Sequence, residues 1–231
     1  MRHLTKTLIL AILGTMGFPL LLHAESITLL ESEGCEIRVE GGSVVFDGCN
    51  VQIVNGTGHT ASTNGRGNLI VGYNETAGEE TLRSGSHNLV VGMGHTYESY
   101  GGLIAGSGNA LFAPAATITG GAHNAVSAFG GAVYGGEENV ANGAFSTITG
   151  GVRNETRHYA PVICGGEGNL AAGYASAILG GFENRTAGAH ATVGGGRGNA
   201  ALAPSATVGG GKARSVHDAY DWRAGPFLAD W

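Results

Sequence analysis

Small and β-branched residues recur at alternate positions along most of the chain, and the pattern returns with a 15-residue period. In residues 139–151, Ser146 and Ile148 fall on one face of an extended strand, because successive side chains of a strand point to opposite faces. The equivalent positions of the other units hold mostly Ala or Ser, followed two residues later by Ile or Val. This pattern predicts short strands that enclose a narrow, ordered core.

Asparagine and a glycine pair mark fixed positions in every unit. A Gly-Gly pair follows each asparagine eleven residues later, from Gly120-Gly121 to Gly210-Gly211, and an Ile or Val stands two residues before each pair. Together these columns define seven uninterrupted repeats over residues 109–213. The asparagines are Asn109, Asn124, Asn139, Asn154, Asn169, Asn184 and Asn199.

A 15-residue unit is too short for a helix-turn-helix repeat, which needs about 33 residues. Two short strands and two corners fit this length, so we predict an all-β fold, a parallel β-solenoid or β-roll with one coil per unit. The glycine pair predicts a corner that needs positive φ or a close backbone approach. The asparagines predict the next corner and a structural ladder, because Asn tolerates the left-handed region and its amide can bond to the Asn one coil away.

The segment 61–108 repeats the pattern with longer steps and predicts wider coils. Asn68, Asn88 and Asn109 are spaced more widely than the later asparagines, which places looped-out residues at 74–84 and 95–100. Loops on one side of a solenoid often carry binding surfaces. Tyr97 and Tyr100 are the candidate binding loop, and packing of the two rings over the wide coils is the alternative interpretation.

Residues 25–60 alternate as strands do and form a predicted N-terminal β segment. Pairing Val39 with Val45 across a turn at Gly41-Gly42 places Cys35 opposite Cys49. In an exported protein this arrangement favours a disulfide, although the separation of the two cysteines also fits positions stacked in adjacent coils. Cys164 falls in a repeat column and is predicted to be unpaired.

The two ends of the chain depart from the repeat. Residues 1–24 are typical of a signal peptide, with Arg2 and Lys6 before an apolar stretch over 8–22 and a cleavage site after Ala24. A retained membrane anchor, which needs about 20 apolar residues, is the alternative. Residues 214–231 form a predicted C-terminal cap or tail, with partner docking as the second interpretation; its bulky residues are Tyr220, Trp222, Phe227 and Trp231.

Composition narrows the class of protein. Glycine supplies 43 of 231 residues without a Gly-X-Y period, which excludes collagen, and 42% apolar content with a net charge of −6 disfavours disorder. Loss of Arg2 and Lys6 with the signal peptide leaves 10 basic against 18 acidic residues, a net charge of −8. We therefore expect an extracellular, cell-surface or periplasmic protein that binds no nucleic acid and inserts into no membrane after signal removal.

The search for chemistry predicts no catalytic, cofactor-binding or metal-binding residues. Only seven of the nine histidines follow residue 24, and none stands near another at metal-ligand spacing. Residues 209–212 resemble a phosphate-binding loop, but Ala206 and Ala213 replace its required Gly and Ser or Thr. One repeat column is predicted to be an exposed, mixed-charge stripe, and it holds His123, Glu138, Arg153 and Glu183.

The units at 146–154 and 175–184 resemble the head repeats of trimeric autotransporter adhesins of the YadA type. Residues 85–92 and 99–106 also resemble arrays in exported bacterial repeat proteins. The resemblance covers residues 68–213, although the adhesin heads commonly use a unit that is one residue shorter. It implies a left-handed parallel β-roll that trimerises side by side, with a surface or adhesive role and no catalytic residues.

These observations predict an exported structural or adhesion-type solenoid without enzymatic activity. Each coil contributes one Ile or Val and a few Ala against a backbone cost of about 1–2 kcal/mol per residue, so we expect a homotrimer that buries more apolar surface. A surface glycan or matrix protein is the expected ligand. The alternatives are a self-assembling extracellular fibre subunit, a carbohydrate-active enzyme on a β-helix scaffold, and an ice-binding protein that uses the outward pairs Thr117/Thr119 and Thr147/Thr149.

Overall fold

The computed structural model describes residues 26–225 except 33, 77, 79 and 80, in two compact units that divide after Gln52. The regular elements of the described residues are all strands, so the predicted all-β class is confirmed. None of the described segments is a helix with the length and hydrophobicity to cross a membrane. The predicted signal peptide, residues 1–24, lies outside the described residues, as do Phe227 and Trp231 of the tail.

The first unit is a three-stranded antiparallel sheet of β1 (Ser26–Ser32), β2 (Cys35–Glu40) and β3 (Ser43–Asp47). Positive φ at Gly41 and Gly42 makes a two-residue turn that sets Glu40 opposite Ser43. Val39 therefore pairs with Val44, and the predicted pairing with Val45 is wrong by one residue.

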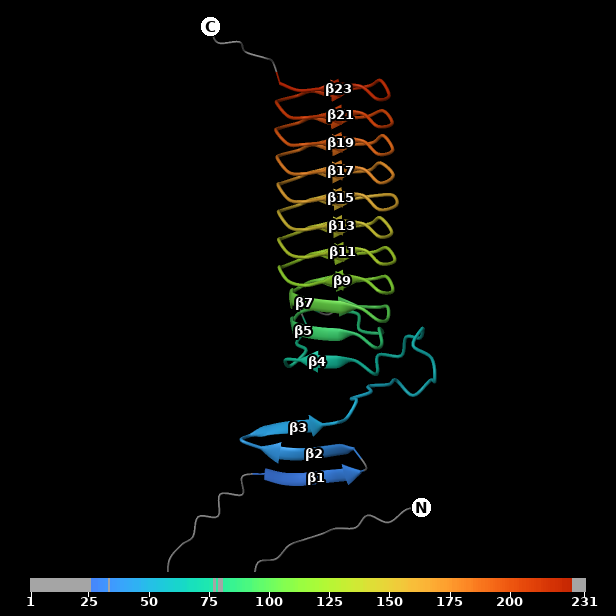
Figure 1. Ribbon diagram of the computed structural model, residues 1–231, viewed down its shortest axis with the longest axis vertical. Helices are drawn as coiled ribbons and strands as arrows, with labels where there is room; N and C mark the ends of the chain where they lie inside the picture. The colour runs from blue at the N-terminus through green and yellow to red at the C-terminus, as the bar shows by residue number, and fades with distance from the viewer. Residues whose placement is uncertain (1–25, 33, 77, 79–80, 226–231) are drawn as a thin grey trace, which may run out of the picture. The chain divides into compact units, whose positions relative to one another are not determined.

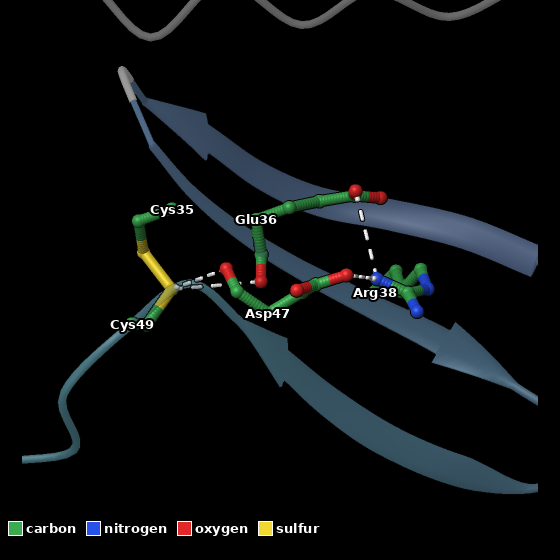
Figure 2. Close-up of a disulfide and its surroundings, with 5 residues drawn as sticks. All are labelled: Cys35, Glu36, Arg38, Asp47 and Cys49. Atoms are coloured by element: carbon green, nitrogen blue, oxygen red, sulfur yellow. Dashed lines mark hydrogen bonds and ion pairs between the residues drawn. A yellow bond between two sulfur atoms is a disulfide. The ribbon is translucent and has the colours of Figure 1, made fainter.

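A disulfide joins Cys35 to Cys49, whose Cα atoms are 4.8 Å apart, so the predicted bond is present (Figure 2). Cys49 lies two residues beyond the end of β3, and this extra reach compensates for the one-residue difference in register. Next to the disulfide, Arg38 of β2 forms ion pairs with Glu36 on the same strand and with Asp47 on β3. The hydrogen bond from Arg38 to Asp47 is the main cause that raises the pKa of the guanidinium.

The second unit is a parallel β-solenoid whose coils stack along one axis (Figure 1). Each full coil contributes one strand to an eleven-stranded sheet and one to a nine-stranded sheet. Isolated bridges between successive coils, from Ser107 through Ala122 to Lys212, form the third side.

The eleven-stranded sheet consists of β4 (Leu69–Val71), β5 (Leu89–Met93), β7 (Leu103–Ser107), β9 (Thr117–Ile118), β11 (Ala132–Val133), β13 (Thr147–Ile148), β15 (Val162–Ile163), β17 (Ala177–Ile178), β19 (Thr192–Val193), β21 (Thr207–Val208) and β23 (Trp222–Arg223). The nine-stranded sheet consists of β6 (Thr96–Tyr97), β8 (Ala110–Leu111), β10 (Ala125–Val126), β12 (Val140–Ala141), β14 (Glu155–Thr156), β16 (Leu170–Ala171), β18 (Arg185–Thr186), β20 (Ala200–Ala201) and β22 (Ser215–Val216).

The core is narrow and follows the predicted alternation. Ser146 and Ile148 are both fully buried, as are the Ile or Val residues at the equivalent position of β5 to β21. Two threonines of the nine-stranded sheet are also buried, and each bonds to a serine ten residues earlier in the chain. Thr156 pairs with Ser146 at 2.8 Å, and Thr186 pairs with Ser176 at 2.8 Å.

Upstream of Asn109 the coil lengths differ from the prediction. The step from Leu69 to Leu89 is longer than a regular coil, but those from Leu89 to Leu103 and from Leu103 to Thr117 are each one residue shorter. Residues 95–100 are therefore not looped out, because they supply β6 and an ordinary corner. The prediction was wrong because Asn88 and Asn109 belong to different columns of the solenoid. The side-chain oxygen of Asn88 accepts the backbone N–H of Gly102 in the next coil, whereas the backbone N–H of Asn109 donates to His95, the preceding member of its own column.

The tail also differs from the prediction, because its described part continues the repeat as one more coil. β22 pairs with β20, and β23 pairs with β21, in the same register as the earlier coils. Arg214 stands where asparagine is expected, and its backbone N–H donates to Asn199 Oδ1 at 2.9 Å. Val216 fills the core position, whereas Tyr220 and Trp222 are exposed.

Candidate functional site

The seven repeated asparagines form a buried column that joins each coil to the next. From Asn124 onward, each backbone N–H donates to the side-chain oxygen of the asparagine one coil earlier; for Asn154 and Asn139 this distance is 3.0 Å. The side-chain Nδ2 of Asn154 donates to the carbonyl oxygens of Gly150 and Gly166. The asparagines therefore form a structural ladder inside the coil, where they are out of reach of a ligand.

The predicted left-handed conformation falls one residue earlier than the asparagines. His123, Glu138, Arg153 and Glu183 have φ between 53° and 56°, and they belong to the predicted mixed-charge stripe at the surface. Arg153 pairs with Glu167 of the next coil. The corner thus turns at the preceding residue, which leaves the asparagine side chain free to point inward.

The glycine corners agree with the prediction of positive φ and close backbone approach. The second glycine of each pair has φ between 79° and 104°. A Cβ built at Gly166 would overlap the carbonyl oxygen of Gly181, whereas a Cβ at Gly165 would meet no atom within 4 Å. In this pair, only the second position therefore requires glycine.

The candidate binding loop is not supported at Tyr97. Only 2% of Tyr97 is exposed, and its hydroxyl accepts a hydrogen bond from Asn74 Nδ2 at 3.1 Å, while Tyr100 is half-buried. Tyr97 pairs with Leu111 in the nine-stranded sheet and occupies the core. The alternative interpretation, packing of this ring within the coils, is the correct one.

His95 takes the place of asparagine at the first position of the ladder. It is buried, its Nε2–H donates to Val91 O at 3.0 Å, and its Nδ1 accepts the backbone N–H of Asn109 at 3.3 Å. Burial lowers the pKa of His95, because desolvation penalises the charged ring. Protonation places a hydrogen on Nδ1 and removes the acceptor for Asn109.

This site predicts a pH-dependent stability of the first coils. The pKa of His95 in the unfolded chain is about 6.5, and its folded value is lower, so the unfolded chain binds more protons between the two values. Above about pH 6.5, His95 is neutral in both states and the solenoid keeps its whole free energy of unfolding. This free energy decreases as the pH falls from there toward the pKa of His95 in the folded protein. Thermal melts across this range measure the effect. H95N restores the asparagine of the column and should remove this part of the pH dependence; an unchanged profile would refute the assignment.

The outward face of the eleven-stranded sheet carries no charged residue over ten coils, and we call it the charge-free face. Its two outward columns, all of whose residues the structure describes, flank the buried Ile and Val residues. The first column contains Leu69, Leu89, Leu103, Thr117, Ala132, Thr147, Val162, Ala177, Thr192 and Thr207. The second contains Val71, Val91, Ala105, Thr119, Tyr134, Thr149, Cys164, Leu179, Gly194 and Gly209. Cys164 is exposed and unbonded, as predicted.

Charged residues lie on the other two sides of the solenoid. The outward positions of the nine-stranded sheet include Glu155 and Arg185, and the bridge column of the third side includes Glu137, Arg197 and Lys212. The charged residues are therefore separated from the charge-free face. The linear sequence does not show this separation, because every coil contributes residues to all three sides of the solenoid.

Four exposed rings stand one above another at the corner between the two sheets, and we call them the aromatic column: Phe129, Phe145, Tyr159 and Tyr174. Successive ring centroids are 5.4 Å apart, and each residue has 42–50% of its surface exposed. Sequence reasoning missed this column, although Phe129, Tyr159 and Tyr174 share one repeat position and only Phe145 is displaced from it, by one residue. The signal was an aromatic residue five or six positions after the asparagine in four successive units.

Among the described residues, no three His, Cys, Asp or Glu side chains gather as a metal site. A comparison with protein-family models and with curated proteins found no match to the chain.

Proposed function

We propose that the chain is an exported, non-catalytic β-solenoid protein of the structural or adhesion type, which associates with copies of itself as a homotrimer through the charge-free face. The observation that carries this proposal is the separation of charge by side. Uncharged surface suits the interior of an assembly, because burying an unpaired charge is costly, whereas the charged sides suit contact with water.

The size of the charge-free face supports an interaction role. Ten strands spaced by about 4.8 Å and three residues wide at about 3.3 Å each cover roughly 480 Å². Six of its twenty outward positions are threonine and the others are apolar residues or glycine, and apolar patches of about 300–600 Å² are the largest on a typical monomer and are often functional. Leu69, Tyr134 and Leu179 are each about half exposed on this face.

Two further features support export and the side-by-side arrangement. The Cys35–Cys49 disulfide suits an oxidising compartment, in agreement with the signal-peptide pattern of residues 1–24. The resemblance to YadA-type heads suggests three copies, and the shorter coils between Leu89 and Thr117 have the unit length common in those heads.

The proposal predicts that charge placed on the charge-free face will separate the subunits. Multi-angle light scattering of the mature wild-type chain should give three times the monomer mass. The double variant T147K/V162K should give a monomer, because each lysine would be buried without a partner. V140K/L170K, on the outward face of the nine-stranded sheet, is the matched control and should remain trimeric. A wild-type monomer at micromolar concentration would contradict the proposal, and a mass that grows without limit would favour the fibre alternative.

A further inference from the structure

We propose that the aromatic column is a binding site for a neutral, linear, β-linked polysaccharide that lies along the solenoid axis. This inference rests on the adhesive part of the proposed function and names its ligand class. It does not depend on the number of copies in the assembly.

The first observation is the continuous row of exposed rings. Phe129 meets Phe145 edge to face at an interplanar angle of 82°, and Tyr159 stacks on Tyr174 at 11°. The row therefore presents a continuous ridge of exposed aromatic side chains over four coils. An extended ridge of this kind matches a long, repeating ligand better than a compact one, which would need a concave pocket.

The second observation is the conformation of Phe145. Its φ is 56°, in the left-handed region, where a bulky side chain is unfavourable and glycine is relaxed. The equivalent corner of the preceding coil has Gly130, and that of the following coil has Ala160. The same corner is left-handed throughout the regular coils, with His190 and Tyr220 among its residues. This conformation therefore belongs to the repeat and places the ring of Phe145 beside Phe129 and Tyr159.

The third observation is a polar row beside the rings, formed by Ser127, Asn142, Glu155 and Arg157. Ser127 and Asn142 hydrogen-bond to each other, and Asn142 Nδ2 donates to Glu155 Oε1 at 3.1 Å. Glu155 also pairs with Arg157, two residues before Tyr159 in the chain. The row offers both donors and acceptors while its two charges compensate each other.

These features match the chemistry of a sugar chain. A pyranose ring has an apolar C–H face that packs on an aromatic ring and equatorial hydroxyls that hydrogen-bond to neighbouring polar groups. The rings advance along the axis by about 4.8 Å per coil, with centroids 5.4 Å apart, which is comparable to the advance per sugar of an extended β-1,4-linked chain. The lack of net charge in the polar row favours a neutral polysaccharide over a polyanionic one.

Calorimetric titration of the mature full-length chain with cellohexaose, xylohexaose and chitohexaose tests the inference, with hexagalacturonic acid as the anionic counterpart. At least one neutral oligosaccharide should bind saturably and more tightly than the anionic one. F145L/Y159L should weaken that binding by at least about tenfold, since buried aromatic contacts dominate binding energy. Y134L removes a ring of similar exposure from the charge-free face and should leave the affinity unchanged.

N142A and R157Q alter only exposed side chains of the polar row, so they test the same site if F145L/Y159L does not fold. Each should weaken binding severalfold while the thermal melt stays the same. Failure of all three neutral oligosaccharides to bind, or equal affinity in these variants and the wild type, would overturn the inference. A change of molecular mass in F145L/Y159L would also overturn it, by assigning the rings to subunit contact. An intact trimer without sugar binding would refute the aromatic column alone and leave the proposed assembly standing.

Discussion

Replacing Gly166 by alanine is expected to destabilise the solenoid by on the order of 4 kcal/mol or more, among the largest effects for a single methyl group. The added Cβ would overlap the carbonyl oxygen of Gly181, which belongs to the backbone of the next coil. The residue also has φ of 86°, where any side chain adds strain. Neither atom can move without separating two coils, so urea unfolding monitored by circular dichroism should show a large fall in midpoint or no folded protein.

Gly165 provides a matched control for this substitution. It is the adjacent residue of the same pair, and a Cβ there would meet no atom within 4 Å. G165A should change the free energy of unfolding by less than about 1 kcal/mol. A small increase is consistent with this expectation, because alanine lowers the conformational entropy of the unfolded chain. Equal effects of G165A and G166A would contradict the close approach between coils.

Replacing Asn154 by alanine is expected to cost about 3 kcal/mol in free energy of unfolding, because a buried donor loses its acceptor. Asn154 Oδ1 accepts the backbone N–H of Asn169 at 3.0 Å, and Nδ2 donates to Gly166 O at 2.9 Å. The carbonyl of Gly166 keeps its bond from Val152, but the N–H of Asn169 has no other acceptor in the ladder. Hydrogen exchange should show the loss of protection at Asn169.

The neighbouring residue gives the control for the asparagine ladder. Arg153 is exposed, and its ion pair with Glu167 lies at the surface, where such pairs contribute about 0–1 kcal/mol. R153A should therefore leave the urea midpoint close to that of the wild type. A smaller loss in N154A than in R153A would show that the ladder does not stabilise the coils.

The 15-residue period was sufficient to predict the strands, the buried Ile148 column and the glycine corners. These features repeat with little variation because every unit has the same local requirements. Each needs a β-branched residue in the core and a glycine where the backbones of two coils approach closely. The disulfide was also predictable, because Cys49 lies outside β3, after Gly48, and its position there tolerates an error of one residue in the register of the strands.

The features that escaped the sequence argument share a physical reason. Asn88 and Asn109 look alike in sequence but occupy different corners of the coil, since two corners can use the same amide chemistry. The last coil was not predicted because Arg214 takes the place of the asparagine that marks the other coils. The ladder needs only the backbone N–H of this residue, which any residue except proline supplies. The aromatic column departs from a single repeat position at Phe145, which is one residue later in its unit, and the stacking of its ring on Phe129 and Tyr159 is visible only in the structure.

The parallel pairing of each coil with the next has a consequence for how such a chain changes its size. Each regular coil pairs with the next coil through the same backbone and asparagine bonds. Residues 155–169, between Asn154 and Leu170, therefore form an interchangeable module. Duplication or loss of whole modules keeps all columns in phase and alters only the reach of the rod, by about 4.8 Å each time. The coils from Leu89 to Thr117 are one residue shorter and still pair in register with their neighbours, so a coil of either length adds the same step to the solenoid.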